Sequence, residues 1–196
     1  MSNADQPTYE RERKFIVADK TILKGASWEL IEQGYVWAKD GFAIRARVVL
    51  DPVREGGELT YVDKLARITA KGPNYGDERE EYEMSVHLPF ARDIIKLTDQ
   101  IIRKRRYHIV DQDSEQTWDI DEFLGDNEGL IVAELEGAKG AGLEELDSVR
   151  ATKMPKWAYR EVTGDSRFNN ENLAANPVSK WKEEGDWKPE SPWDWD

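Results

Sequence analysis

Most extended segments of this chain carry two like charges at alternate positions, and this pattern limits the folds that the chain can adopt. In a strand, residues i and i+2 lie on the same face, about 6.6 Å apart. Solvent-exposed faces usually mix the two signs, because like charges placed opposite each other destabilise a sheet. Pairs sorted by sign therefore indicate a bound group that neutralises them. The acidic pairs are Glu81/Glu83, Asp119/Asp121 and Glu134/Glu136, and the basic pairs are Arg45/Arg47 and Lys104/Arg106.

The chemistry of these pairs narrows the identity of the bound group. Carboxylates without thiols or many histidines suit a hard divalent cation such as Mg²⁺ or Mn²⁺. Clustered arginine and lysine suit a phosphate-rich anion. A site that needs both suggests a metal–polyphosphate complex. The alternation does not say which face is enclosed, since any single pair also fits an ordinary strand with its charges in water.

The composition excludes several classes of protein. The net charge of -12 argues against general binding to nucleic acid or to an anionic membrane. The 196 residues include no cysteine, which excludes disulfides and thiolate metal sites. The N-terminus lacks a secretory pattern and no stretch is apolar enough to span a bilayer, so we expect a cytoplasmic protein. We expect one domain over residues 1–179 and an acidic tail rich in Trp and Pro over residues 180–196.

A run near the N-terminus, Glu10-x-Glu12-x-Lys14, resembles the ExExK signature of the CYTH superfamily, also called triphosphate tunnel metalloenzymes. Later segments resemble the family's strands in order: GFAIRARV, ITAKGP, REEYE, RKRRYHI, TWDIDEF and LIVAELEG. The segment REVTGDSRFNNENLAANP resembles the family's closing segment, so the resemblance spans about residues 9–177. It looks most like the bacterial single-domain tripolyphosphatases. It implies an α+β fold: an eight-stranded, largely antiparallel closed β-barrel around a charged tunnel, with helices packed on the outside.

The resemblance also implies roles for the charged side chains. The expected metal ligands are Glu10, Glu12, Asp121, Glu134 and Glu136. The expected phosphate-binding residues are Lys14, Arg45, Arg47, Lys71, Arg79, Lys104 and Arg106. The expected catalytic set is Glu10, Glu12, Lys14, Arg45, Arg47 and Lys71, and Glu81, Glu83 and Asp119 are further tunnel acids.

The expected reaction is hydrolysis of a linear triphosphate with Mg²⁺ or Mn²⁺ as cofactor. Inorganic tripolyphosphate is the expected substrate, with ATP as a weaker one, and the chain is expected to be a monomer or a homodimer. The same fold hosts class IV adenylyl cyclases, thiamine triphosphatases and nucleoside or RNA 5′-triphosphatases, so the fold alone leaves the activity open. A non-enzymatic alternative is a module that binds polyphosphate or a nucleotide, but pure polyanion binding has no use for the acids.

Several positions keep a second interpretation. Arg47 also fits a salt bridge to a neighbouring strand, and Lys71 also fits the end of a strand. His108 shares a face with Lys104 and Arg106 and fits either a proton relay or a structural role. The segment between Arg47 and Lys71 is long, which predicts a hairpin that projects from the barrel or flanks its mouth. Helices are expected over residues 89–100, 142–154 and 169–176.

Overall fold

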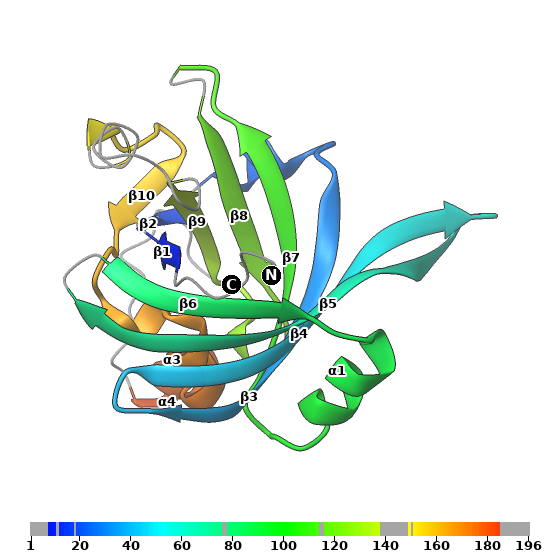
Figure 1. The fold of residues 1–196 in the computed structure, drawn as a ribbon. Helices are drawn as coiled ribbons and strands as arrows, with labels where there is room; N and C mark the ends of the chain where they lie inside the picture. Colours follow the sequence, from blue (N-terminus) through cyan, green and yellow to red (C-terminus); the bar gives the residue numbers. More distant parts are fainter. Residues whose placement is uncertain are drawn as a thin grey trace.

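The computed structural model of the chain describes residues 8–10, 12–17, 19–75, 78–113, 116–137, 149 and 151–184 (Figure 1). Its strands are β1 (Thr8–Glu10), β2 (Glu12–Val17), β3 (Trp28–Lys39), β4 (Phe42–Glu55), β5 (Glu58–Tyr75), β6 (Glu78–Ser85), β7 (Ile101–Val110), β8 (Thr117–Phe123), β9 (Ile131–Glu136) and β10 (Ala158–Glu161). Within the described residues they form one ten-stranded sheet in the order β1-β6-β5-β4-β3-β7-β8-β9-β2-β10. Each neighbouring pair is antiparallel.

Tight turns join the central strands of the sheet. The turn between β3 and β4 contains Asp40 and Gly41, whose φ angles of 52° and 83° are the positive values that a type I′ hairpin requires. Gly56 and Gly57 have φ angles of 60° and 90° at the tip of the β4–β5 hairpin. These turns fix the register of both ladders, and with it the side chains that share a face.

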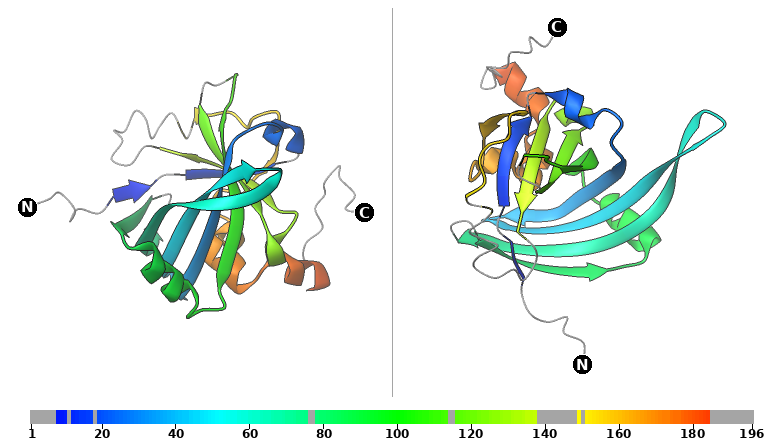
Figure 2. Two further views of the ribbon diagram at one scale, coloured as in Figure 1. Left: turned by 90° about the vertical axis from the view of Figure 1, so that its right-hand side faces the viewer. Right: turned by 90° about the horizontal axis from the view of Figure 1, so that it is seen from above.

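The sheet is more open than the sequence predicted. The α+β class and the large antiparallel sheet are confirmed. The number of strands in the sheet exceeds the predicted eight, because the segment 8–17 contributes two short strands, β1 and β2, and because β10 pairs with β2 at the edge. The sheet curls strongly without closing into a barrel, and β1 and β10 are the ends of its order (Figures 1 and 2).

Helix α1 (Leu88–Ile95) covers part of the outer face of the sheet. It buries Ala91 and Ile95 against Ala46, Val48 and Ala66 of β4 and β5. Since side chains alternate along a strand, the burial of Ala46 and Val48 under α1 turns Arg45 and Arg47 to the opposite, concave face. The outside position predicted for the helices is therefore confirmed for α1.

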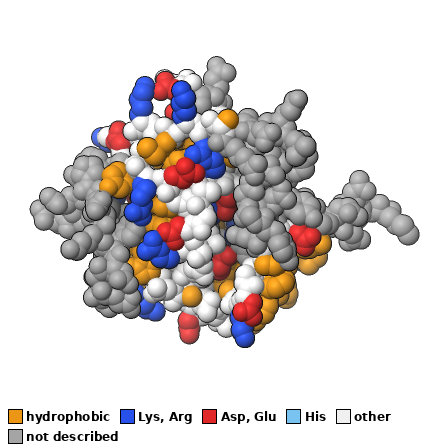
Figure 3. All heavy atoms as spheres, turned by 90° about the vertical axis from the view of Figure 1, so that its left-hand side faces the viewer, with side chains coloured by type: hydrophobic (Ala, Val, Ile, Leu, Met, Phe, Trp, Pro, Cys, Tyr) orange, Lys and Arg blue, Asp and Glu red, His pale blue; other side chains and the backbone are white. Residues whose placement is uncertain are grey.

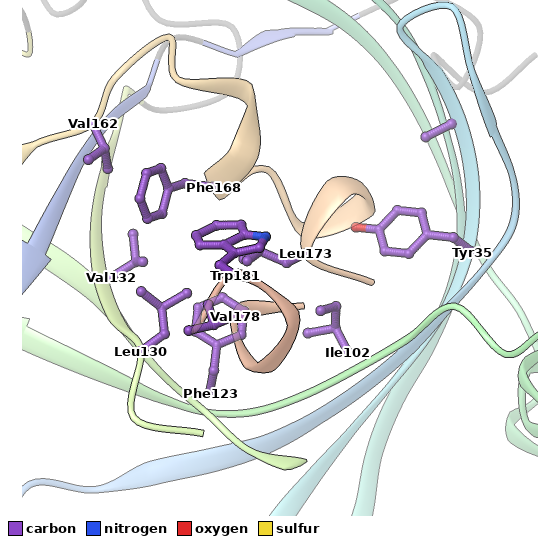
Figure 4. Packing of buried hydrophobic residues seen from close by; sticks show 11 residues of the cluster. Tyr35, Ile102, Phe123, Leu130, Val132, Val162, Phe168, Leu173, Val178 and Trp181 are labelled. Atoms are coloured by element: carbon purple, nitrogen blue, oxygen red, sulfur yellow. The ribbon is translucent and has the colours of Figure 1, made fainter. Parts of the chain in front are cut away.

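Helices α3 (Asn170–Ala175) and α4 (Val178–Glu184) lie on the concave side instead. Leu173, Val178 and Trp181 pack in one cluster with Ile102 of β7 and Val132 of β9. These two strand residues share a face with the inward-facing charges, and Figure 4 shows the cluster between the strands and the α3–α4 segment. The prediction that helices pack on the outside is wrong for α3 and α4, because one end of the inner face is apolar and has to be covered.

Two of the three expected helices are observed: α1 overlaps residues 89–100 but begins one residue earlier and ends at Ile95, and α3 lies within residues 169–176. Of the third, over residues 142–154, only residues 149 and 151–154 are described, and residues 152–154 are not helical. Helix α4 crosses the expected domain boundary at residue 179, and Trp181 is 4% exposed, so the packed part of the chain extends past that boundary. The remaining tail, residues 185–196, lies outside the described part. In the described ranges, no helix has the length and apolar character needed to cross a membrane.

The far ends of β4 and β5 leave the rest of the sheet as a two-stranded ribbon, which confirms the projecting hairpin (Figure 2). The ribbon is tied back to β3 by side-chain contacts. The rings of Tyr61 and Trp28 meet edge to face at 6.3 Å, and Lys64 Nζ donates to Glu29 Oε2 at 2.9 Å. These contacts hold the base of the ribbon against β3.

Candidate active site

The concave face of the sheet encloses a cavity of about 210 Å³, here called the central cavity. Its walls come from β2 to β7, from β9 and from the segment that enters α3. Six cationic and six acidic side chains of the described residues line it, so its formal charge is balanced. The cations are Lys14, Arg45, Arg47, Arg67, Lys71 and Arg106, the acids are Glu12, Glu81, Glu83, Glu134, Glu136 and Glu171, and the uncharged residues are Tyr35, Asn169 and Asn170.

The charged pairs point inward, which the alternation alone could not decide. Lys14, Arg45, Glu81, Arg106 and Glu134 are each at most 8% exposed. Apolar side chains of the same strands face outward and are covered by α1 or by the segments around residues 149–158. On the face drawn in Figure 3, acidic and basic side chains are interspersed outside the grey areas. The pairs sorted by sign thus line the cavity, while the part of the surface described in this view mixes the two signs.

An acidic cluster forms where β2 lies beside β9. Glu12, Glu134 and Glu136 each offer one carboxylate oxygen, and these oxygens lie within 4.8 Å of one another. The register explains the arrangement, because Glu12 is opposite Glu136 and Lys14 is opposite Glu134. Lys14 Nζ lies 2.9 Å from Glu12 Oε1 and 3.1 Å from Glu134 Oε1. Burial opposes the charge of this ammonium, but the two carboxylates outweigh burial and raise the pKa of Lys14 above its usual value.

Arg106 of β7 connects three carboxylates beside this cluster. Its Nε and Nη2 each donate to Asp121 at 2.7 Å, its Nη1 donates to Asp119 at 2.9 Å, and its Nη2 also donates to Glu134 at 2.8 Å. Burial disfavours the charged forms, yet Arg106 and its neighbours hold the pKa values of Asp121 and Glu134 below the usual range. These carboxylates therefore remain ionised at neutral pH.

Lys104 lies deeper than the sequence predicted. It is 0% exposed, does not line the central cavity in the described structure, and pairs with Asp121. Its Nζ also lies 3.4 Å from Asn170 Oδ1 and 5.6 Å from the ring centre of Phe123. Burial and the neighbouring Arg106 lower the pKa of Lys104 to about 8. Lys104 thus braces Asp121 and α3 from behind the cavity wall.

Strands β5 and β6 form a second zone of paired charges. Lys71 Nζ lies 2.6 Å from Glu81 Oε2, and the two residues are paired across the ladder. Arg67 pairs with Glu83, and the Thr69 hydroxyl donates to the same carboxylate at 3.1 Å. Lys71 is therefore an inward-facing residue of the wall, not only the end of a strand.

The paired arginines of β4 meet an uncharged residue of β3. Arg45 Nη1 and Arg47 Nε both donate to the Gln33 amide oxygen at 3.2 Å. Gln33 Nε2 in turn donates to the Tyr35 hydroxyl at 3.0 Å. Burial, together with the nearby positive charges of Arg45 and Arg106, lowers the pKa of Arg47 to about 10, which still leaves it charged at neutral pH.

The structure brings most of the predicted site residues together, but not all of them. Asp119 and Asp121 bind Arg106 and lie outside the acidic cluster, so the role of Asp121 as a metal ligand stays a prediction. Glu10 and Arg79 are backbone partners on β1 and β6, and their side chains lie outside the described part of the structure. His108 is half-exposed, and its Nδ1 lies 2.7 Å from Asp119 Oδ1.

The sequence did not single out several residues that line or brace the central cavity. Gln33 is uncharged, so a search for charge pairs passes over it, and Tyr35 fits an aromatic residue of the barrel mouth as well as one of the core from the sequence alone. Arg67 has the same alternation as Lys71 and could have been found by that signal. The segment 169–171 comes from a distant part of the chain, which local patterns cannot place in the cavity.

Comparison with known proteins supports the inference from fold and site. The chain is 36% identical to an inorganic triphosphatase of Acetivibrio thermocellus over 176 residues, which cover 89% of this chain and 98% of the relative. Two crystal structures of NE1496, one solved as a hypothetical protein and one as an inorganic triphosphatase, are similar with a TM-score of 0.54 and 25% identity. They match 84% of this chain and 97% and 93% of their own chains. No family model matches the sequence.

The curled antiparallel sheet and its inward, sign-sorted charges are those of a triphosphate tunnel metalloenzyme, as the resemblance predicted. The chain belongs to the inorganic triphosphatases of the CYTH superfamily.

Proposed function

We propose that this chain hydrolyses inorganic tripolyphosphate to pyrophosphate and phosphate with a divalent metal ion. The observation that carries the proposal is the division of the central cavity into an acidic wall on β2 and β9 and a basic wall on β4 and β5. A metal ion suits the first wall and a chain of phosphates suits the second. The relatives named as inorganic triphosphatases make tripolyphosphate the first substrate to test.

We further propose that the sheet closes around the substrate as a tunnel. The segment 8–17 supports this, because β1 pairs with β6 and β2 pairs with β9, while a single residue separates β1 from β2. One continuous segment thus pairs with strands near both ends of the strand order. A closed form would exclude water from the phosphate chain and strengthen its contacts with the basic wall.

The acidic cluster fits a hard divalent cation, for which Mg²⁺ and Mn²⁺ are the candidates. Its carboxylate oxygens lie within 4.8 Å of one another, and the Lys14 ammonium already lies between two of the acids. We propose Glu12, Glu134 and Glu136 as ligands, with Glu10 and Asp121 as further candidates. When bound, the ion would neutralise charge on the phosphate oxygens and orient the attacking water.

In this proposal the side chains of the protein supply binding, orientation and proton transfer. Arg45 and Arg47 bind the phosphate chain with fork-shaped donor groups, and Lys71 and Lys14 add point charges. Water attacks a terminal phosphorus atom, the P–O anhydride bond breaks, and pyrophosphate leaves with the electron pair. The proton of the water passes to a carboxylate of the acidic wall. No covalent intermediate is needed.

The proposal is tested by measuring phosphate release from tripolyphosphate, ATP and thiamine triphosphate with Mg²⁺, Mn²⁺ or a chelator. We expect the fastest release from tripolyphosphate, slower release from ATP, and none with the chelator. Formation of cAMP from ATP would identify a cyclase instead. Binding of tripolyphosphate without any turnover in either metal would identify a binding module.

We expect Arg45→Ala to raise the KM for tripolyphosphate by about tenfold to a hundredfold, with a smaller effect on kcat. The reason is that a hydrogen bond between charged groups contributes about 1.5–3 kcal/mol. The measurement is steady-state phosphate release over a range of substrate concentrations. Arg103→Ala is the matched control, because Arg103 is on the outer face of β7 and pairs with Glu32 there. Equal KM values for the two variants would remove Arg45 from the substrate site.

A further inference from the structure

Strand β3 places two uncharged polar side chains, Gln33 and Tyr35, among the charges of the concave face. Gln33 is 0% exposed and Tyr35 is 2% exposed. Gly34, between them, permits this arrangement, because a Cβ there would lie 2.9 Å from Thr98 Cγ2 in the segment that crosses the outer face. Tyr35 N also donates to Gln100 O at 2.9 Å. The backbone at this point is therefore held from outside while both side chains reach inward.

The orientation of the Gln33 amide is determined by its neighbours. Its Oε1 faces Arg45 Nη1 and Arg47 Nε, and guanidinium groups donate hydrogen bonds but do not accept them. The amide oxygen must therefore face the arginines, and the amide nitrogen must face Tyr35. The Tyr35 oxygen accepts a hydrogen bond from this nitrogen at 3.0 Å.

This orientation leaves the single proton of the Tyr35 hydroxyl for another acceptor. Tyr35 lines the central cavity beside Arg45 and Arg47, and Figure 4 shows its hydroxyl pointing inward from β3. Burial raises the pKa of Tyr35 to about 12, despite the opposing influence of Arg45. The proton is therefore retained throughout the neutral range.

We propose that the Tyr35 hydroxyl donates a hydrogen bond to a phosphoryl oxygen of the bound substrate, and that Gln33 is the positioning residue that aims it. This inference rests on the proposed function of the central cavity. The Gln33 amide oxygen also accepts hydrogen bonds from Arg45 and Arg47. One amide thus orients three donor groups toward the phosphate chain: the two guanidinium groups and the Tyr35 hydroxyl.

A neutral amide suits this position better than a carboxylate. A glutamate at residue 33 would keep the acceptor for both arginines, but its charge would compete with the phosphate for them. It would also remove the donor that orients Tyr35. Gln33 thus orders the two guanidinium groups without reducing their net charge.

The first test is the affinity for tripolyphosphate, measured by calorimetry without metal so that no turnover occurs. We expect Tyr35→Phe to weaken binding by about tenfold, the effect of one hydrogen bond to a charged group. Tyr107→Phe is the matched control, because the Tyr107 hydroxyl donates to Glu122 at 3.2 Å and does not line the cavity. Equal affinities for Tyr35→Phe and the wild type would overturn the proposal.

The second test separates positioning from packing at residue 33. We expect Gln33→Met to weaken the binding of tripolyphosphate. In the double variant with Tyr35→Phe, we expect the loss of binding free energy to be smaller than the sum of the losses in the two single variants. Gln33→Glu should keep the thermal midpoint of unfolding at or above that of Gln33→Met but bind tripolyphosphate more weakly than Gln33→Met. Additive losses, or a Gln33→Glu variant that binds like the wild type, would overturn the positioning role.

The wild-type protein distinguishes failure of this inference from failure of the proposed function. If the wild type neither binds nor hydrolyses tripolyphosphate, the proposed function fails and this inference fails with it. If the wild type does both and Tyr35→Phe does both equally well, only the role of Tyr35 fails.

Discussion

Glu136→Gln is expected to lower kcat for tripolyphosphate by about a hundredfold or more while leaving the protein folded. Glu136 is one of the three acids whose carboxylate oxygens lie within 4.8 Å of one another. An amide in its place keeps the size of the side chain but removes one negative charge from the cluster. Metal ions contribute several kcal/mol to such reactions, and about 1.4 kcal/mol corresponds to tenfold in rate.

Glu136 is a better test than Glu134, because Glu134 also pairs with Lys14 and Arg106 and its loss would affect stability. The control is Glu122→Gln, since Glu122 is on the outer face of β8, where it pairs with Arg105. We expect the loss in Glu136→Gln to become smaller at high metal concentration. Wild-type turnover in Glu136→Gln at limiting metal would place the metal elsewhere.

Much of the fold was predictable because strand alternation reports which residues share a face. Arg45 and Arg47 share one face of β4 as predicted, and Ala46 and Val48 lie on the other. The position of α3 and α4 was not predictable, because Ile102 has the same alternation as the inward-facing charges of β7. An apolar residue at such a position fits a concave face that a helix covers as well as an outer face that packs in a hydrophobic core. Only the tertiary structure distinguishes these two arrangements.

The residues of the candidate site that are charged and alternate along a strand could be predicted from the sequence. Those whose role depends on the three-dimensional arrangement could not. Lys104 and Arg106 have equivalent positions in the alternation, yet Lys104 is fully buried behind the wall while Arg106 lines the cavity. Gln33 and Tyr35 act through hydrogen bonds that cross from β3 to β4. Such contacts depend on the register between the strands, which the sequence specifies only indirectly.

Arg106→Met is expected to destabilise the fold by about 3–5 kcal/mol, the cost of removing one partner from a buried ion pair. Arg106 donates to Asp119, Asp121 and Glu134, and a methionine, which matches only the aliphatic part of the arginine side chain, replaces none of these bonds. Asp121 would keep its contact with Lys104, but burial lowers the pKa of Lys104 to about 8, so this lysine holds its proton less firmly. The measurement is urea unfolding at neutral pH. The control is Arg103→Met, at an exposed position on the opposite face of β7.

The pH dependence of unfolding is a second, independent measurement of the effect of Arg106→Met on stability. Asp121 and Glu134 have folded pKa values below their usual ones, although burial opposes this. Their contribution to stability is therefore present above the ordinary carboxyl range and is lost as the pH falls through the lower, folded values. Without Arg106 the folded pKa of Asp121 rises most, because burial remains while its main positive partner is gone. Glu134 keeps Lys14 and Lys104, so its folded pKa rises less. The acid-unfolding midpoint of Arg106→Met should then lie at a higher pH than that of the wild type. Coincident acid transitions for the two proteins would show that Arg106 does not hold these carboxylates ionised.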